Sequence, residues 1–266
     1  MGLSRSDKIF KIRNGEMMEA CGLELYPIKM RHFEIFSSCK EALALRMSSL
    51  PVRMMTLDFL SAVFAMEIEA LKVGAQNAGL FGRVMQLFYL ALRVDIDRNT
   101  LAESIQCDAN GNLTAIKVWQ NGKEHHISPY DFSCVIRPIL AEQNGIELPN
   151  EQDNIDLVKS NDEKKALTSF AKLKVNTDDL IASVAYQSRM SEREINDMTV
   201  REFEYRRKAI ERDKRYMLYA SAELSGMVKF KDGNPYQSWC FDSYGDELGT
   251  MGVAELGKAL QGAKPQ

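Results

Sequence analysis

The sequence predicts a mainly helical α+β protein, in which a helical domain with a small antiparallel β meander precedes a smaller all-helical domain. Apolar residues recur every three or four positions in several segments, as they do on the buried face of an α-helix. Two Asn-Gly pairs separate short strand-like runs, which is typical of β-hairpins because both central turn positions adopt positive φ. Hydrophobic residues make up 45% and charged residues 27% of the 266-residue chain, a balance typical of folded globular proteins.

The N-terminal part is expected to contain three helices that share one core. Residues 17–36 predict a strand and then the start of a helix, which ends before Pro51 because proline disfavours the α conformation of the preceding residue. Thr56 is the expected N-cap of the second helix, and the segment 74–79 separates it from the third. The two apolar stripes consist of Leu57, Leu60, Phe64, Ile68 and Leu71, and of Leu80, Val84, Leu87, Phe88 and Ala91.

Three strand-like runs at 101–107, 113–119 and 124–128 predict the β meander. Ser128-Pro129 then predicts the start of a helix, with serine as N-cap and proline at the first helical position. Pro138 is expected to kink or shorten this helix, because proline has no N–H to donate.

The domain boundary is expected at residues 144–165, a polar and acidic segment that predicts a linker. The helical domain with the meander then covers 1–143, and the all-helical C-terminal domain covers 166–242. Residues 243–266 are rich in Gly and Ala with few large apolar groups, so they predict a flexible tail.

The C-terminal domain is expected to contain a helix capped by Thr177 and a longer helix capped by Thr199. Glu202 lies three residues after Thr199 and completes a capping box. Gly226 is the expected end of the longer helix. Within it, an apolar residue recurs every seven positions, and this stripe is expected to be core: Phe203, Ile210, Met217 and Leu224.

Charge and motifs favour no enzymatic chemistry, so the chain is not expected to be an enzyme, and no cofactor or metal is expected. The formal net charge is −3, which excludes a basic field over the whole chain. Five scattered cysteines form no C-x-x-C pair, which favours reduced thiols. His125 and His126 are adjacent on a predicted strand, so they point to opposite faces and cannot share a metal. Residues 252–259 have Walker-like Gly and Lys spacing, but Ala259 replaces the Ser or Thr that binds magnesium.

Residues 201–215 carry seven basic and four acidic residues with aromatic residues among them. Such a helix can lie on nucleic acid, or it can be a solvated face with ion pairs such as Glu204–Lys208 and Glu211–Arg215. The second interpretation is favoured because the acidic residues would repel phosphates. No nucleic-acid partner is therefore expected. No run of apolar residues is long enough to span a membrane, so no membrane association is expected either.

A family resemblance lies near the C-terminus. The segment 197–203 (DMTVREF) begins a charged helix that ends in 222–227 (AELSGM), and a segment from Pro235 to Trp239 follows. This arrangement resembles the C-terminal part of tail assembly chaperones of tailed bacteriophages, especially those of Gram-positive hosts. The Tyr26-Pro27-Ile28 entry into a helical domain is also similar to those proteins.

The resemblance implies a non-enzymatic chaperone that acts in the host cytoplasm during viral morphogenesis. Such a protein binds the hydrophobic tape-measure protein, keeps it soluble and helps to recruit tail-tube subunits around it. The candidate partner-binding residues are amphipathic aromatic side chains that lie off the seven-residue stripe: Tyr205, Tyr216, Tyr219 and Trp239. Two alternatives stay open, namely a structural tail or baseplate component and a nucleic-acid-binding regulator that uses the helix 201–215.

Overall fold

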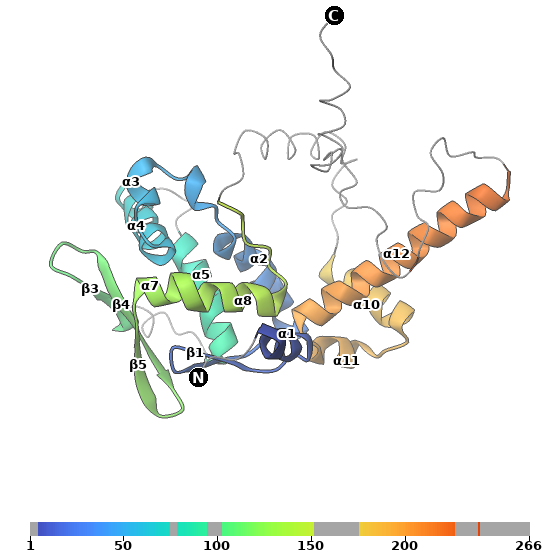
Figure 1. Cartoon of the computed structure of the whole chain (residues 1–266), viewed down its shortest axis with the longest axis horizontal. Helices are drawn as coiled ribbons and strands as arrows, with labels where there is room; N and C mark the ends of the chain where they lie inside the picture. Colours follow the sequence, from blue (N-terminus) through green and yellow to red (C-terminus); the bar gives the residue numbers. More distant parts are fainter. Residues whose placement is uncertain (1–4, 75–78, 95–102, 152–175, 227–238, 240–266) are drawn as a thin grey trace, which may run out of the picture. The chain divides into compact units, whose positions relative to one another are not determined.

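The computed structural model describes residues 5–74, 79–94, 103–151, 176–226 and 239 (Figure 1). The protein is mainly helical with two small antiparallel sheets, which confirms the predicted fold class. The chain divides into two compact units, Met1–Glu204 and Tyr205–Gln266. Most of the predicted linker, the first residues of the predicted C-terminal domain and the predicted tail lie outside the described residues, and the predicted domain boundaries stay a prediction.

The first unit begins with a helix and a tight β-hairpin. Helix α1 (Arg5–Arg13) precedes strands β1 (Met18–Ala20) and β2 (Leu23–Leu25), which pair antiparallel. Cys21 and Gly22 form the turn with φ of +53° and +79°, the conformation that a type I′ turn requires. The sequence predicted one strand here, because cysteine is not a usual turn residue.

Three helices of this unit share one core, as predicted. The helices are α2 (Phe33–Leu43), α4 (Phe59–Lys72) and α5 (Leu80–Leu92). The short turn η1 (Met30–His32) precedes α2, while η2 (Met47–Ser49) and α3 (Val52–Met55) lie between α2 and α4. The N-cap of α4 is Asp58 rather than Thr56, since Thr56 is the C-cap of α3. Only part of the apolar stripe that the sequence predicted for α4 is buried. Leu57, which precedes the helix, and Leu71 are exposed.

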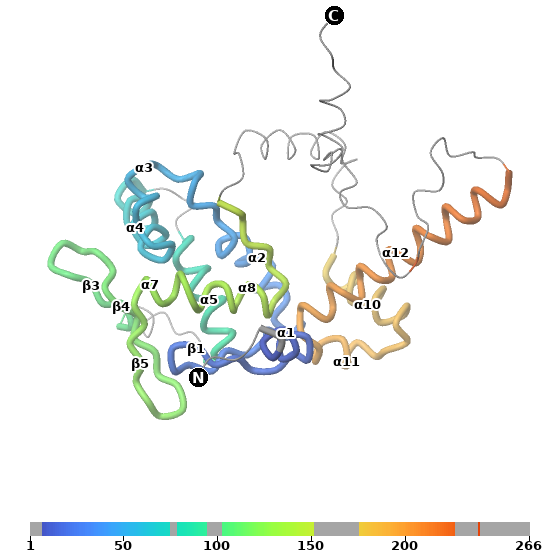
Figure 2. Tube along the Cα trace, viewed as in Figure 1, coloured from blue at the N-terminus to red at the C-terminus, as the bar shows by residue number. Residues whose placement is uncertain are grey.

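The predicted three-stranded meander is confirmed. Strands β3 (Ile105–Cys107), β4 (Leu113–Gln120) and β5 (Lys123–Ile127) pair antiparallel in that order (Figure 2). Asn121 and Gly122 have positive φ of 53° and 75°, so the second turn is the Asn-Gly turn that the sequence predicted. At the end of β4, the Gln120 side chain accepts a hydrogen bond from Glu24 N at 2.7 Å and donates to Glu24 O at 2.9 Å, which attaches the meander to the first hairpin.

A helix with a change of winding follows the meander. It runs through α7 (Pro129–Asp131), a π-helical turn (Phe132–Ile136) and α8 (Arg137–Asn144). Ser128 accepts a hydrogen bond from Asp131 N, which confirms it as the N-cap. Pro138 lies just after the π turn, so the predicted disturbance of the helix occurs as a change from π to α winding.

The last helices of the described chain are α10 (Thr177–Ser188), α11 (Glu192–Asp197) and α12 (Val200–Leu224). Asn176, not Thr177, caps α10, because its side chain accepts a hydrogen bond from Asp178 N. Helix α12 extends from the first unit into the second. Gly226 follows its last turn with φ of +69°, as predicted for a residue that ends a helix.

Candidate partner-binding site

The two segments that carry the family resemblance contact each other in the first unit. Lys29 and Thr199 form an antiparallel β-bridge. Val200 N donates to Ile28 O and Met30 N donates to Met198 O, both at 2.9 Å. The segment that follows Tyr26-Pro27 therefore holds the start of α12 in place through backbone hydrogen bonds.

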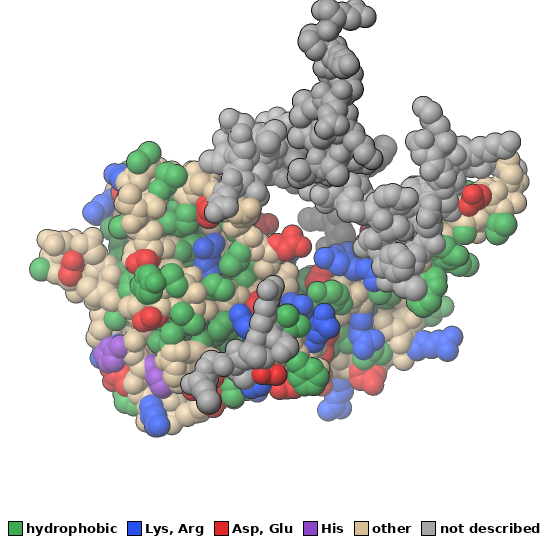
Figure 3. All heavy atoms as spheres, in the orientation of Figure 1, with side chains coloured by type: hydrophobic (Ala, Val, Ile, Leu, Met, Phe, Trp, Pro, Cys, Tyr) green, Lys and Arg blue, Asp and Glu red, His purple; other side chains and the backbone are tan. Residues whose placement is uncertain are grey.

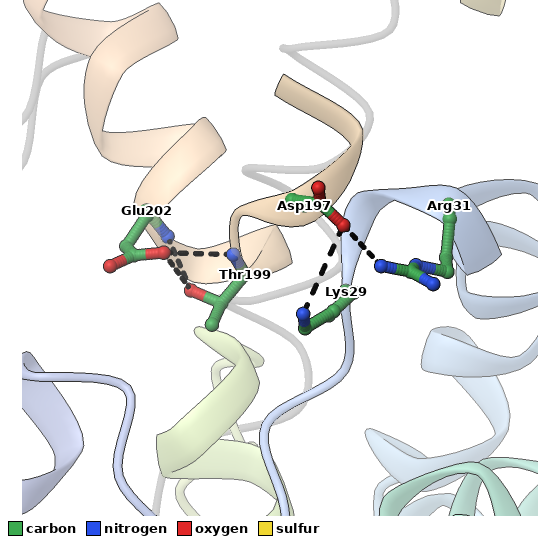
Figure 4. A network of polar contacts seen from close by, with 5 residues as sticks. All are labelled: Lys29, Arg31, Asp197, Thr199 and Glu202. Carbon is green, nitrogen blue, oxygen red and sulfur yellow. Dashed lines mark hydrogen bonds and ion pairs between the residues drawn. The ribbon is translucent and has the colours of Figure 1, made fainter. Parts of the chain in front are cut away.

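Polar side chains surround this junction (Figure 4). The Glu202 carboxylate accepts hydrogen bonds from Thr199 N at 2.8 Å and from the Thr199 hydroxyl at 3.0 Å, while Glu202 N donates to that hydroxyl at 3.2 Å. This confirms the predicted capping box. Asp197 forms an ion pair with Arg31 and lies 4.0 Å from Lys29 Nζ. These charged side chains are about half exposed, so the ion pairs contribute little to stability.

The beginning of α12 is buried and its second half is not. Val200 and Phe203 are fully buried, and the ring centroids of Phe203 and Phe33 lie 6.0 Å apart. Further along the seven-residue stripe, Met217 is 58% exposed and Leu224 is 88% exposed. The expectation that this stripe is core is therefore wrong beyond Phe203. The seven-residue spacing identifies an apolar face, but it does not require that anything covers the face.

The predicted partner-binding residues all lie in the second unit. Tyr205 and Trp239 are 58% and 60% exposed, whereas Tyr216 and Tyr219 are half-buried. The three tyrosines fall on one face of α12, because separations of 11 and 14 residues are close to whole helical turns. Trp239 stands between residues outside the described chain. The assignment of these four residues to a partner site stays a prediction.

Sequence reasoning missed the exposed apolar residues at the end of α12. Leu218 is 67% exposed and follows Met217 directly. Met217 and Leu224 are seven residues apart and share one face of the helix, with Leu218 beside it; we call these three exposed side chains the α12 apolar surface (Met217, Leu218 and Leu224). The seven-residue spacing identified Met217 and Leu224 as one apolar face, but no signal in the sequence indicated that this face is exposed.

The charged run on α12 is organised by ion pairs. Glu211 contacts Arg207 at 3.4 Å and Arg215 at 2.5 Å, so the predicted Glu211–Arg215 pair is confirmed. Each pair is separated by four residues, which places the charges next to each other on the helix surface. Part of the positive charge of 201–215 is thus balanced by Glu211 within the helix.

Titratable groups with shifted pKa values lie at structural joints. Burial lowers the pKa of Arg137 to about 10, and its guanidinium donates to Leu43 O and Leu45 O at 3.0 Å and stacks on the Phe59 ring. The Tyr26 hydroxyl donates to Glu24 at 2.7 Å, and this bond lowers the pKa of Glu24. The Arg137 contacts connect α8 to α2 and α4, whereas the Tyr26–Glu24 bond lies within one segment at the end of β2.

Among the described residues, no cluster of three or more His, Cys, Asp or Glu side chains is arranged to hold a metal ion. His125 and His126 occupy β5, and the His126 ring lies 3.0 Å from Glu124. The Walker-like residues 252–259 lie outside the described chain.

No protein-family model, curated protein or solved structure matches this chain. In the part of the chain that the structure describes, no helix is both long and apolar enough to cross a membrane.

Proposed function

We propose that this protein is a non-enzymatic tail assembly chaperone of a tailed bacteriophage, which binds the tape-measure protein in the host cytoplasm. One observation supports this proposal above the others, namely the α12 apolar surface. Its three side chains are between 58% and 88% exposed at the end of a 25-residue helix. A partner helix binds such a surface by packing apolar side chains at positions i, i+3, i+4 and i+7 against it.

The chemistry of the surface suits a partner with varied apolar helices. Methionine is flexible and polarizable, so a Met-containing surface can repack against different side chains. The sequence DMTVREF, on which the resemblance depends, forms the junction that anchors α12 to the first unit. The segment that carries the resemblance therefore holds in place the start of the helix on which the α12 apolar surface lies. Recruitment of tail-tube subunits is part of the same proposal.

The two alternatives make different predictions. A structural tail or baseplate component would remain in purified particles, whereas a chaperone would be absent from them. For a regulator that binds nucleic acid through 201–215, the pairing of Glu211 with both Arg207 and Arg215 reduces the positive charge available to phosphates. The chaperone is the proposal that the exposed apolar residues favour.

Co-expression with the tape-measure protein of the same genome tests the proposal. The triple variant M217S/L218S/L224S removes the α12 apolar surface, and we expect it to leave the tape-measure protein insoluble while this protein itself stays folded. A matched control, L71S/V73S, changes apolar residues of α4 and its C-cap that are 60% and 80% exposed; it should solubilise the tape-measure protein as well as the wild type does.

A second variant tests the predicted aromatic residues. We expect Y219A/W239A to weaken co-purification of the tape-measure protein without a change in the melting curve. If both this variant and the serine triple variant retain the wild-type yield of soluble tape-measure protein, the proposed binding role of α12 is wrong.

A further inference from the structure

A groove of about 460 Å³ lies in the first unit, between the N-terminal end of α2 and helices α10 and α11. Four of its less exposed lining side chains are apolar, namely Met30, Phe33, Ile35 and Ile181, and the other two are the polar Thr177 and Asn196. This volume is typical of pockets that hold a small molecule. It can take several side chains of a docked helix but not the helix backbone.

The exposed lining side chains of the groove are mostly acidic. Glu34, Asp178, Asp179 and Glu192 belong to the first turns of α2, α10 and α11. Within the described chain, none of these four side chains has an ion-pair partner, and the one arginine of the lining, Arg31, is paired with Asp197. An acidic residue in a first turn stabilises its own helix. That effect does not explain why three such turns meet around one apolar groove, which leaves the groove with uncompensated negative charge.

A surface of opposite charge lies on α12. Arg206, Ile210, Lys214 and Met217 follow one another at separations of four, four and three residues, so they share one face of the helix. Figure 3 shows hydrophobic and basic side chains gathered along α12. Arg206 and Lys214 are exposed and have no ion-pair partner among the described residues, in contrast to Arg207 and Arg215.

We infer that the groove of one copy of this protein binds the Arg206–Met217 face of α12 of a second copy. Ile210 and Met217 supply the apolar side chains that enter the groove. In this contact, Arg206 and Lys214 of one copy lie near the carboxylates that line the groove of the other copy, which are Glu34, Asp178, Asp179 and Glu192. Because the two surfaces differ, the contact is heterologous, and each copy keeps one groove and one helix face for further copies.

Self-association through this contact goes beyond the proposed function, although both use Met217. The electrostatic part predicts that association weakens as ionic strength rises, because exposed charges are screened over about 8 Å at physiological salt. It also predicts that a partner helix on α12 competes with the second copy. The protein alone suffices for the test, so the result is independent of whether the tape-measure protein is the partner.

Sedimentation velocity of the full chain over a range of micromolar concentrations, with charge-reversed variants, tests the inference. E34K/D179K reverses charge in the groove and R206E/K214E reverses charge on the helix. We expect each variant to raise the apparent dissociation constant about tenfold or more, because the attraction between groove and helix is then cancelled in the first variant and reversed in the second. The control E19K/E41K reverses two exposed carboxylates that are not part of the groove lining, and it should self-associate like the wild type.

Mixing the two variants gives the decisive result. A groove-reversed copy keeps an intact helix face, and a helix-reversed copy keeps an intact groove. The mixture should therefore associate more tightly than either variant alone, which also shows that both variants are folded. A wild type that stays monomeric at every concentration overturns the inference. So does self-association that neither reversal weakens, or a mixture in which the two variants do not combine.

Discussion

Replacement of Asn144 should destabilise the first unit, because its side chain satisfies two buried backbone groups. Asn144 is 2% exposed at the end of α8. Its Oδ1 accepts a hydrogen bond from Ile28 N, and its Nδ2 donates to Leu140 O, both at 2.8 Å. In N144A the buried Ile28 N–H has no acceptor, which costs about 1–3 kcal/mol. Alanine has the higher helix propensity and offsets at most about 0.7 kcal/mol of this.

The variant N144D tests the two hydrogen bonds of Asn144 separately. An aspartate carboxylate can still accept from Ile28 N, but it has no donor for Leu140 O. Burial and the facing carbonyl raise the pKa of this carboxyl in the folded state. The stability of N144D relative to the wild type should therefore be highest below about pH 4, the ordinary aspartate pKa, where the protonated carboxyl donates to Leu140 O. It should fall as the pH rises through the raised pKa of the folded state.

Urea denaturation followed by circular dichroism measures both variants. N14A is the matched control, because Asn14 is exposed and its side chain donates only to the exposed Glu16 carboxylate. We expect this control to change the free energy of unfolding by less than about 0.5 kcal/mol. A midpoint for N144A equal to that of the wild type would refute the reasoning about Ile28 N, and a pH-independent N144D would refute the reasoning about Leu140 O.

Three further outcomes are expected. F203A should lower the free energy of unfolding by about 3–5 kcal/mol, whereas L224A should change it by less than about 0.5 kcal/mol, since Phe203 is fully buried and Leu224 is 88% exposed; equal effects in denaturation would contradict the assignment of buried and exposed ends. T199A should lower the free energy of unfolding by about 0.5–2 kcal/mol and T199S by much less, because serine retains the capping hydroxyl. Equal losses in the two variants would contradict the capping role of the Thr199 hydroxyl. Burial raises the pKa of Cys39, so iodoacetamide should label it later than the exposed Cys134, and mass spectrometry of timed samples that finds the reverse order would contradict its burial.

Local chemistry made much of the fold predictable. Asn121-Gly122 needs positive φ at both positions, and Ser128-Pro129 and Thr199 with Glu202 are short motifs whose hydrogen bonds involve near neighbours. Such features depend on a few adjacent residues, so a single sequence suffices to predict them. The first hairpin was missed because Cys21 adopts φ of +53° only where the surrounding structure requires it.

Features that depend on distant residues could not be predicted in the same way. The spacing of Phe203, Met217 and Leu224 identified one apolar face of α12, but burial depends on what packs against each turn. Phe203 meets Phe33, which lies far away in the sequence, whereas Met217 and Leu224 are exposed. The acidic groove likewise combines the first turns of three helices, and none of these turns indicates a groove by itself.

The bridge between Lys29 and Thr199 has a consequence for synthesis of the protein in the cell. The two strands of backbone that it joins are about 170 residues apart. At the ~5–20 residues per second typical of translation, roughly 9–34 s pass between the synthesis of the first strand and that of the second. Ile28 N–H can pair with Asn144 only after 116 further residues are made, and Ile28 O has to wait still longer for Val200. The nascent N-terminal part therefore spends this time with an open backbone edge, which is the period in which contact with another nascent chain would compete with correct folding.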